Sequence, residues 1–192
     1  VGMGITGTDV TKNVADMVLA DDNFATIVSA VEEGRKIYDN IRNAIQLLLS
    51  SNLSEVLSIF FATMLGFTLF EPVHLLWINL ITDCFPALAL GLEKGDPDIM
   101  KRKPRDSKEG IFAGGMGIDC AYQGVMVTVL TLVAYALGIM MANGSAMPLR
   151  KVFAINDMTA PLLHKNGMTM AFLTLSMAEI FHSFNMRSRR QS

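Results

Sequence analysis

The sequence is poor in charge and in cysteine. Asp, Glu, Lys and Arg make up 18% of its 192 residues, against about 25% in an ordinary soluble domain. The scarcity of charge argues against a disordered chain or a coiled coil, and the lack of a basic stripe argues against a nucleic-acid-binding protein. The two cysteines, Cys84 and Cys120, do not make a disulfide framework.

Apolar residues are abundant instead, at 51% of the chain with a mean hydropathy of +0.38. A helix needs about 20 apolar residues to cross a bilayer, and the sequence has stretches of that kind over about 44–66, 73–92, 118–142 and 167–186. We therefore predict a mainly α-helical, polytopic transmembrane helix bundle with four spans, embedded in a lipid bilayer.

Basic residues near the ends of the spans indicate the orientation of the chain, because they favour the cytoplasmic side. Twelve of them lie before the first span, in the loop 93–117 or after the fourth span, whereas three lie in the other two connections. This asymmetry predicts that the N-terminus, the loop 93–117 and the C-terminus are cytoplasmic.

The first 40 residues have a soluble composition, with seven acids and three bases. Short strands are predicted over 1–5 and 17–20, with a helix over about 9–15 between them. No proline interrupts 24–66, so one helix is predicted to continue from this part into the first span. Strand–helix–strand–helix is about half of a parallel α/β sheet. Because Val1 also lies inside an apolar run, we expect a fragment of a longer chain.

Three carboxylates lie deep inside the predicted spans, namely Glu55, Asp83 and Glu179. An ionised acid near the bilayer centre costs about 2.5–3.5 kcal/mol, so three unpaired acids would cost on the order of 8–10 kcal/mol. The spans contain no Lys or Arg to pair with them. We therefore expect the acids to face a protein interior that a cation visits; the alternative is that they hydrogen-bond between helices.

Other oxygen-bearing side chains lie at helical spacing from two of these acids. Asn52 precedes Glu55 by three residues and Asn79 precedes Asp83 by four, so each amide shares a helix face with an acid. Thr82 directly precedes Asp83 and completes that side of the second span. The serines of the first span are interpreted as packing or hydrogen-bonding residues: Ser50, Ser51, Ser54 and Ser58.

Pro86 interrupts the second span. Because proline has no N–H, the carbonyl of Thr82 loses its helical partner, and broken helices in membranes usually line an ion or substrate cavity. The offered ligands are all oxygens, of which a hard cation such as Ca²⁺ takes six to eight. Zinc or copper would need His or Cys, and His74, His164 and His182 show no ligand spacing.

At these residues the chain resembles the calcium-transporting P-type ATPases, and the resemblance covers essentially its whole length. Residues 6–12 and 17–24 are similar to the end of the phosphorylation domain of those pumps, 31–35 to the stalk, 51–55 to the fifth transmembrane helix, 76–83 with 86–91 to the sixth, and 96–105 to the loop that follows it. Together these motifs are specific, although no single one would be.

The resemblance implies a division of the chain into two parts. Residues 1–36 would be the C-terminal piece of a cytoplasmic α/β phosphorylation domain and stalk, and 37–192 the transmembrane ion-binding domain, equivalent to helices five to eight of the pump. It also implies the residues that bind the transported ion: Asn52, Glu55, Asn79, Thr82, Asp83 and Glu179.

The resemblance also bears on the ion. Sodium–potassium pumps have an aspartate where Asn79 stands, which favours Ca²⁺ here, and the presence of both Glu55 and Glu179 suggests two ion sites. The chain departs from the calcium-pump pattern at Lys101, where an acid is common, and this leaves the coupling role of the loop open. Two readings compete with a calcium pump: a P-type pump for Mn²⁺ or Na⁺, and a self-standing four-span channel or structural membrane protein.

The chemistry that drives such a pump is not in this sequence. The family needs Asp-Lys-Thr-Gly-Thr, which carries the phosphorylated aspartate, and the magnesium motif Gly-Asp-Gly-Val-Asn-Asp; neither occurs. The resemblance thus implies no catalytic residue and no ATP or Mg²⁺ site here. It implies that the partners are the N-terminal pump domains and the remaining helices of the same chain.

Overall fold

A computed structural model describes residues 1–106 and 109–187, which divide into two compact units. The first unit contains residues 1–40 and 94–105, and the second contains residues 41–93 together with the described chain from Asp106 onward. Three of the basic residues used to predict orientation lie outside the described residues: Lys108, Arg189 and Arg190.

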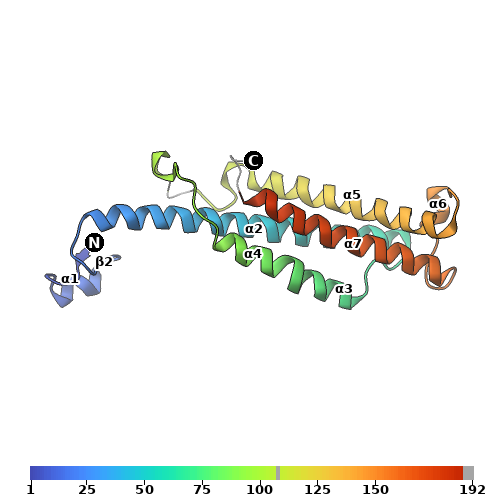
Figure 1. Ribbon diagram of the computed structural model, residues 1–192, viewed down its shortest axis with the longest axis horizontal. Coiled ribbons are helices and arrows are strands. Elements are labelled where there is room, and N and C mark those ends of the chain that lie inside the picture. The colour runs from blue at the N-terminus through green and yellow to red at the C-terminus, as the bar shows by residue number, and fades with distance from the viewer. Residues whose placement is uncertain (107–108, 188–192) are drawn as a thin grey trace. The chain divides into compact units, whose positions relative to one another are not determined.

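The first unit begins with the predicted strand–helix–strand order. Strands β1 (Gly2–Met3) and β2 (Val18–Leu19) pair in parallel, and helix α1 (Asp9–Val14) lies between them in sequence (Figure 1). Thr8 caps α1, because its hydroxyl oxygen accepts a hydrogen bond from the amide of Thr11 at 3.3 Å. The predicted strand–helix–strand order of the first 20 residues is confirmed.

The loop segment of the first unit is fixed to the start of helix α2 by arginines. Arg35 donates hydrogen bonds of 3.0 Å to the carbonyls of Ile99 and Arg102. The guanidinium of Arg102 in turn bridges two carboxylates, Asp39 at 2.5 Å and Asp96 at 2.7 Å. Lys101, the departure noted in the sequence, forms an exposed ion pair with Asp98 and is not needed for this contact.

Helix α2 (Ala25–Leu65) confirms the continuous helix predicted over 24–66. Its 41 residues include part of both units. It ends at Gly66, whose φ of 87° is the left-handed conformation that favours glycine after a helix.

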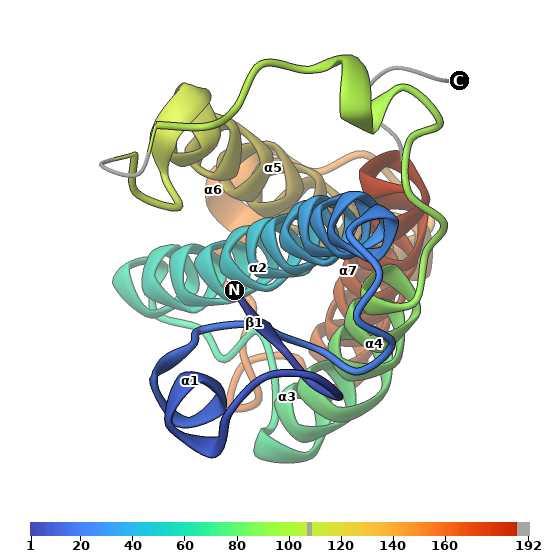
Figure 2. The ribbon, with the colours of Figure 1, turned by 90° about the vertical axis from the view of Figure 1, so that its left-hand side faces the viewer.

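The second unit is a bundle of long helices, and Figure 2 looks along it. Besides residues 41–65 of α2, its elements are α3 (Pro72–Trp77), the π-helix η1 (Ile78–Asp83), α4 (Cys84–Gly91), the short 3₁₀ helix η3 (Ala113–Gly115), α5 (Met116–Asn143), α6 (Leu149–Val152) and α7 (Pro161–Met186). Helices α5 and α7 pack along their lengths, and α5 contacts α2 where the Thr128 hydroxyl oxygen lies 3.2 Å from the carbonyl oxygen of Ser54. In the first unit, the segment 94–105 adds the 3₁₀ helix η2 (Ile99–Lys101).

Three described helical segments are long and apolar enough to cross a membrane: Ala25–Leu65, Pro72–Gly91 and Ala113–Asn143. They cover the first three predicted spans except for the last residue of the first span and the last residue of the second. The predicted span 167–186 lies within α7, which starts six residues earlier because Pro161 occupies its first turn. Helix α7 has 26 residues, but its hydropathy is too low for it to be counted with these three segments. The reason is that Glu179, His182 and several hydroxyl residues lie within it.

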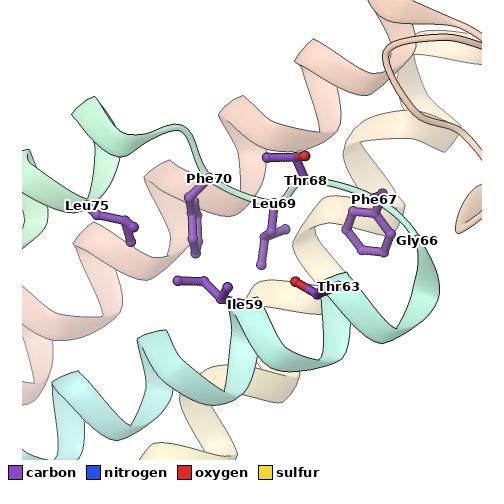
Figure 3. Close-up of a pocket in the computed structure, with 8 residues that line it drawn as sticks. All are labelled: Ile59, Thr63, Gly66, Phe67, Thr68, Leu69, Phe70 and Leu75. Atoms are coloured by element: carbon purple, nitrogen blue, oxygen red, sulfur yellow. The ribbon is translucent and has the colours of Figure 1, made fainter.

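The apolar core lies at the end of the bundle where α2 passes into α3. The ring of Phe67 stacks on that of Tyr135 with centroids 4.4 Å apart, and the Tyr135 hydroxyl lies 2.8 Å from Nδ1 of His164. These contacts hold the end of α2 close to the start of α7. A cavity of about 300 Å³ opens at the same end, between α2, residues 66–70 and α3 (Figure 3).

Close packing of α5 on α7 requires glycine at Gly138. A Cβ atom there would lie 2.8 Å from the side chain of Met170 and 2.9 Å from the carbonyl oxygen of Asn166, and a backbone atom cannot give way. We expect Gly138→Ala to lower the free energy of unfolding of the bundle by about 1–3 kcal/mol, the usual cost of overpacking. Gly117→Ala in the same helix is the control, because it meets nothing within 4 Å and removes a helix-weakening glycine.

The measurement is the temperature at which half of the detergent-solubilised full-length protein remains monodisperse. Equal midpoints for Gly138→Ala and Gly117→Ala would contradict the close approach of the two helices.

Candidate metal centre

Three acids from three separate elements meet inside the second unit. Glu55 of α2, Asp83 of η1 and Glu179 of α7 each offer a carboxylate oxygen, and these oxygens lie within 4.8 Å of one another. All three side chains are buried, with 7%, 1% and 2% of their surface exposed, respectively. No ion pair joins any of them to a basic side chain in the described part of the chain. The cluster therefore gathers three acids in a buried place, without a basic partner among the described residues.

Asn79 adds an amide to the cluster. Its Nδ2 lies 3.3 and 3.1 Å from the two carboxylate oxygens of Glu55 and also donates to the carbonyl of Leu75 at 3.0 Å. The amide thus links η1 to α2 through one acid. Rotating the amide by 180° would turn its oxygen toward the same space, since the nitrogen and oxygen of an amide are nearly equal in size.

Thr82 joins η1 to α7. Its hydroxyl oxygen lies 2.8 Å from the carbonyl of Ile78 and 3.0 Å from Oε2 of Glu179. A hydroxyl has a single proton, so it donates to one of these oxygens at a time. The other carboxylate oxygen of Glu179, Oε1, is buried and makes no hydrogen bond.

Asp83 is the least satisfied of the three acids. Neither of its carboxylate oxygens makes a hydrogen bond of normal geometry, although both are buried. The hydroxyl of Ser51 lies close to this carboxylate but is itself without a well-formed hydrogen bond. A buried acid with free lone pairs offers ligand positions to a cation.

Asn52 lies apart from the five other predicted ligands. It is exposed, and its amide nitrogen donates to the carbonyl of Leu48 in its own helix at 2.7 Å. The structure thus brings together Glu55, Asn79, Thr82, Asp83 and Glu179 and leaves Asn52 outside the cluster.

The π-helix η1 explains how three neighbouring ligand residues reach different partners. Its six residues end at Asp83, three positions before Pro86. A π-helical turn is wider than an α-helical one and is frequent at functional sites, and proline at this place removes the N–H that an α-helix would need. Asn79 consequently reaches α2, while Thr82 reaches α7.

The four serines of α2 look alike in the sequence, but they differ in hydrogen bonding in the structure. Ser50 and Ser54 donate to carbonyls of their own helix at 2.9 and 2.7 Å. Ser51 and Ser58 are equally buried, yet neither makes a well-formed hydrogen bond within the described residues, and neither does Ser176 of α7, which the sequence had not singled out. The sequence contains a signal that could have identified two of these serines, because Ser58 and Ser176 each lie three residues from one of the buried acids.

Comparison with known proteins identifies the family of this chain. The family described as "Cation transporting ATPase, C-terminus" matches residues 67–192, which include Asn79, Thr82, Asp83 and Glu179. The chain belongs to the cation-transporting ATPases.

Named relatives extend the match to the start of the chain. Calcium-transporting ATPase 1 of Bacillus cereus is 49% identical over 100% of this chain and 21% of its own length. An endoplasmic reticulum-type calcium-transporting ATPase 3 of Arabidopsis thaliana is 39% identical over 100% of the chain and 20% of its own length. Sodium/potassium exporting P-type ATPase 1 of Saccharomyces cerevisiae is 45% identical over 67% of the chain. This cation-transporting ATPase chain therefore spans about one fifth of the length of the calcium-transporting relatives.

Proposed function

We propose that this chain is the ion-binding membrane part of an ATP-driven calcium pump. The observation that carries the proposal is the meeting of three buried acids from α2, η1 and α7. Together with the oxygens of Asn79 and Thr82, the six carboxylate oxygens are enough for a cation that takes six to eight oxygen ligands. The family match and the names of the relatives that cover the whole chain support calcium as the cargo.

The proposal includes a fourth membrane span in α7. Helix α7 packs along α5, which is apolar enough to cross a membrane, and its polar residues Glu179 and Thr169 are accounted for by the acid cluster and by a hydrogen bond to its own backbone. A buried acid facing other helices is how a polar span is tolerated in a bilayer. With four spans, the distribution of basic residues favours a cytoplasmic location for the loop 93–117 and for both ends.

The proposed mechanism divides the work between this chain and the rest of the pump. ATP phosphorylates an aspartate elsewhere, with Mg²⁺, and the resulting change reaches Glu55 along helix α2. The three acids then alternate between holding Ca²⁺ from the cytoplasm and releasing it on the other side, in exchange for protons. The lipid bilayer and the remaining helices cover exposed apolar side chains such as Val56, Leu80 and Phe85.

The test is ATP-dependent calcium uptake into sealed vesicles that contain the full-length pump. We expect uptake of ⁴⁵Ca²⁺ that requires ATP and collapses with a calcium ionophore. Manganese and sodium are included as competitors, because a second candidate function, sodium export, is favoured by the similarity to the yeast sodium/potassium exporter. Uptake of sodium without calcium would replace the first proposal by the second, and ATP-independent flux would favour a channel.

A further inference from the structure

Two buried serines lie one helical turn from the acid cluster and are displaced toward the same end of the bundle. Ser58 follows Glu55 by three residues on α2, and Ser176 precedes Glu179 by three residues on α7. Residues three apart share a helix face. Contacts near Phe67 and His164 bring the end of α2 to the start of α7, so both serines are shifted toward the α2–α3 loop.

Neither hydroxyl has a partner among the described residues. Ser58 is 0% and Ser176 4% exposed, and neither oxygen makes a hydrogen bond. The helix backbone can accept such bonds, because Ser54 donates to the carbonyl of Ser51 and Ser183 to that of Ile180, both at 2.7 Å. A buried hydroxyl without a partner costs about 1–3 kcal/mol, so these two positions call for a ligand from outside the protein.

The cavity shown in Figure 3 lies farther along in the same direction. It measures about 300 Å³ and is bounded by Ile59 and Thr63 of α2, the loop residues 66–70, and Leu75 of α3. The hydroxyls of Thr63 and Thr68 give it polar contacts, and its volume is ample for several water molecules. The acid cluster, the two serine hydroxyls and the cavity therefore follow one another along the bundle, from its middle to the end at the α2–α3 loop.

We infer that Ser58 and Ser176 form a water-filled step between the acid cluster and this cavity, through which the transported cation moves toward the α2–α3 loop. The inference rests on the proposed function and adds the route and its residues. Hydroxyl oxygens are hard ligands that suit a partly hydrated cation. Because they are neutral, they hold the cation more weakly than the acids do, which is what a transit position needs.

Cysteine accessibility tests the route in the full-length pump in sealed vesicles. In a background with Cys84→Ser and Cys120→Ala, Ser58→Cys and Ser176→Cys are exposed to a membrane-impermeant, positively charged methanethiosulfonate added to one side at a time. Thr68→Cys, at an exposed loop position, marks the side of the α2–α3 loop. Ser54→Cys and Ser183→Cys are matched controls, because their native hydroxyls are buried but bonded to their own helices.

We expect Ser58→Cys and Ser176→Cys to react from the loop side on the order of tenfold faster than the two controls, because buried thiols without water access are inert. We also expect calcium added on that side to slow both reactions. Rates equal to those of the controls, reaction only from the opposite side, or reaction that no cation slows would each overturn the route. Protection by sodium or manganese but not by calcium would support the route and reject calcium as the cargo, which separates the two proposals.

Discussion

Replacing Asp83 by asparagine should abolish calcium-dependent phosphorylation of the full-length pump by ATP. Asp83 is 1% exposed, and neither of its carboxylate oxygens makes a hydrogen bond of normal geometry within the described residues. The substitution keeps the size of the side chain but removes one of the three acids and replaces an oxygen ligand by an amide nitrogen that cannot bind a cation. The measurement is the amount of acid-stable phosphoenzyme formed from labelled ATP over a range of calcium concentrations.

Two controls separate loss of the site from loss of the fold. Asp119→Asn makes the same chemical change at an exposed position in the first turn of α5 and should leave phosphorylation unchanged. The Asp83→Asn variant should still form phosphoenzyme from inorganic phosphate without calcium, because that reaction needs a folded pump but not an occupied cation site. Wild-type phosphorylation from ATP at micromolar calcium in Asp83→Asn would count decisively against Asp83 as a ligand.

Replacing Glu179 by glutamine should lower the calcium bound per pump to about half of the wild-type value. Glu179 is the ligand that α7 contributes, and its Oε1 is buried and free while Oε2 meets Thr82. The family resemblance suggests two ion sites, and the eight oxygens of the cluster are enough for only one calcium ion, so the two sites must share these ligands with the remaining helices of the pump. Loss of the α7 carboxylate is therefore expected to empty one position and leave the one built by Glu55 and Asp83.

The measurement is equilibrium binding of ⁴⁵Ca²⁺ to the full-length pump, normalised to the number of phosphorylation sites. Glu32→Gln, an exposed glutamate of α2, is the matched control and should bind as the wild type does. An unchanged stoichiometry in Glu179→Gln would argue for a single-site pump in which Glu179 has another role.

Much of the candidate site was predictable because the bilayer makes charge costly. Glu55, Asp83 and Glu179 stand out in spans without lysine or arginine, since each acid would cost about 2.5–3.5 kcal/mol without a partner. The long helix α2 was equally predictable, because proline is absent from 24–66 and helix formation depends on such local features. The start of α7 was missed, because the polar residues from His164 to Asn166 look like loop in a hydropathy profile and are helical in the structure.

The hydrogen-bond partners of the individual polar side chains were not predictable from the sequence. Asn52 shares a face with Glu55 by spacing, yet its amide bonds to the carbonyl of Leu48 and stays outside the cluster. Ser54 and Ser58 have the same chemistry and burial, but only Ser54 uses a backbone carbonyl. Side chains of this length choose between their own helix and a neighbour, and that choice depends on how closely the neighbour approaches.

The sequence by itself determined that this protein crosses a membrane and carries acids where a bilayer would exclude them, because hydropathy and charge are properties of each segment alone. Only the tertiary structure decided that the acids meet. Thr82 and Glu179 are 97 positions apart and touch through a hydroxyl, and a π-helix turns Asn79 toward a different helix from Thr82. Such contacts arise from the packing of three helices against one another, which no single segment specifies.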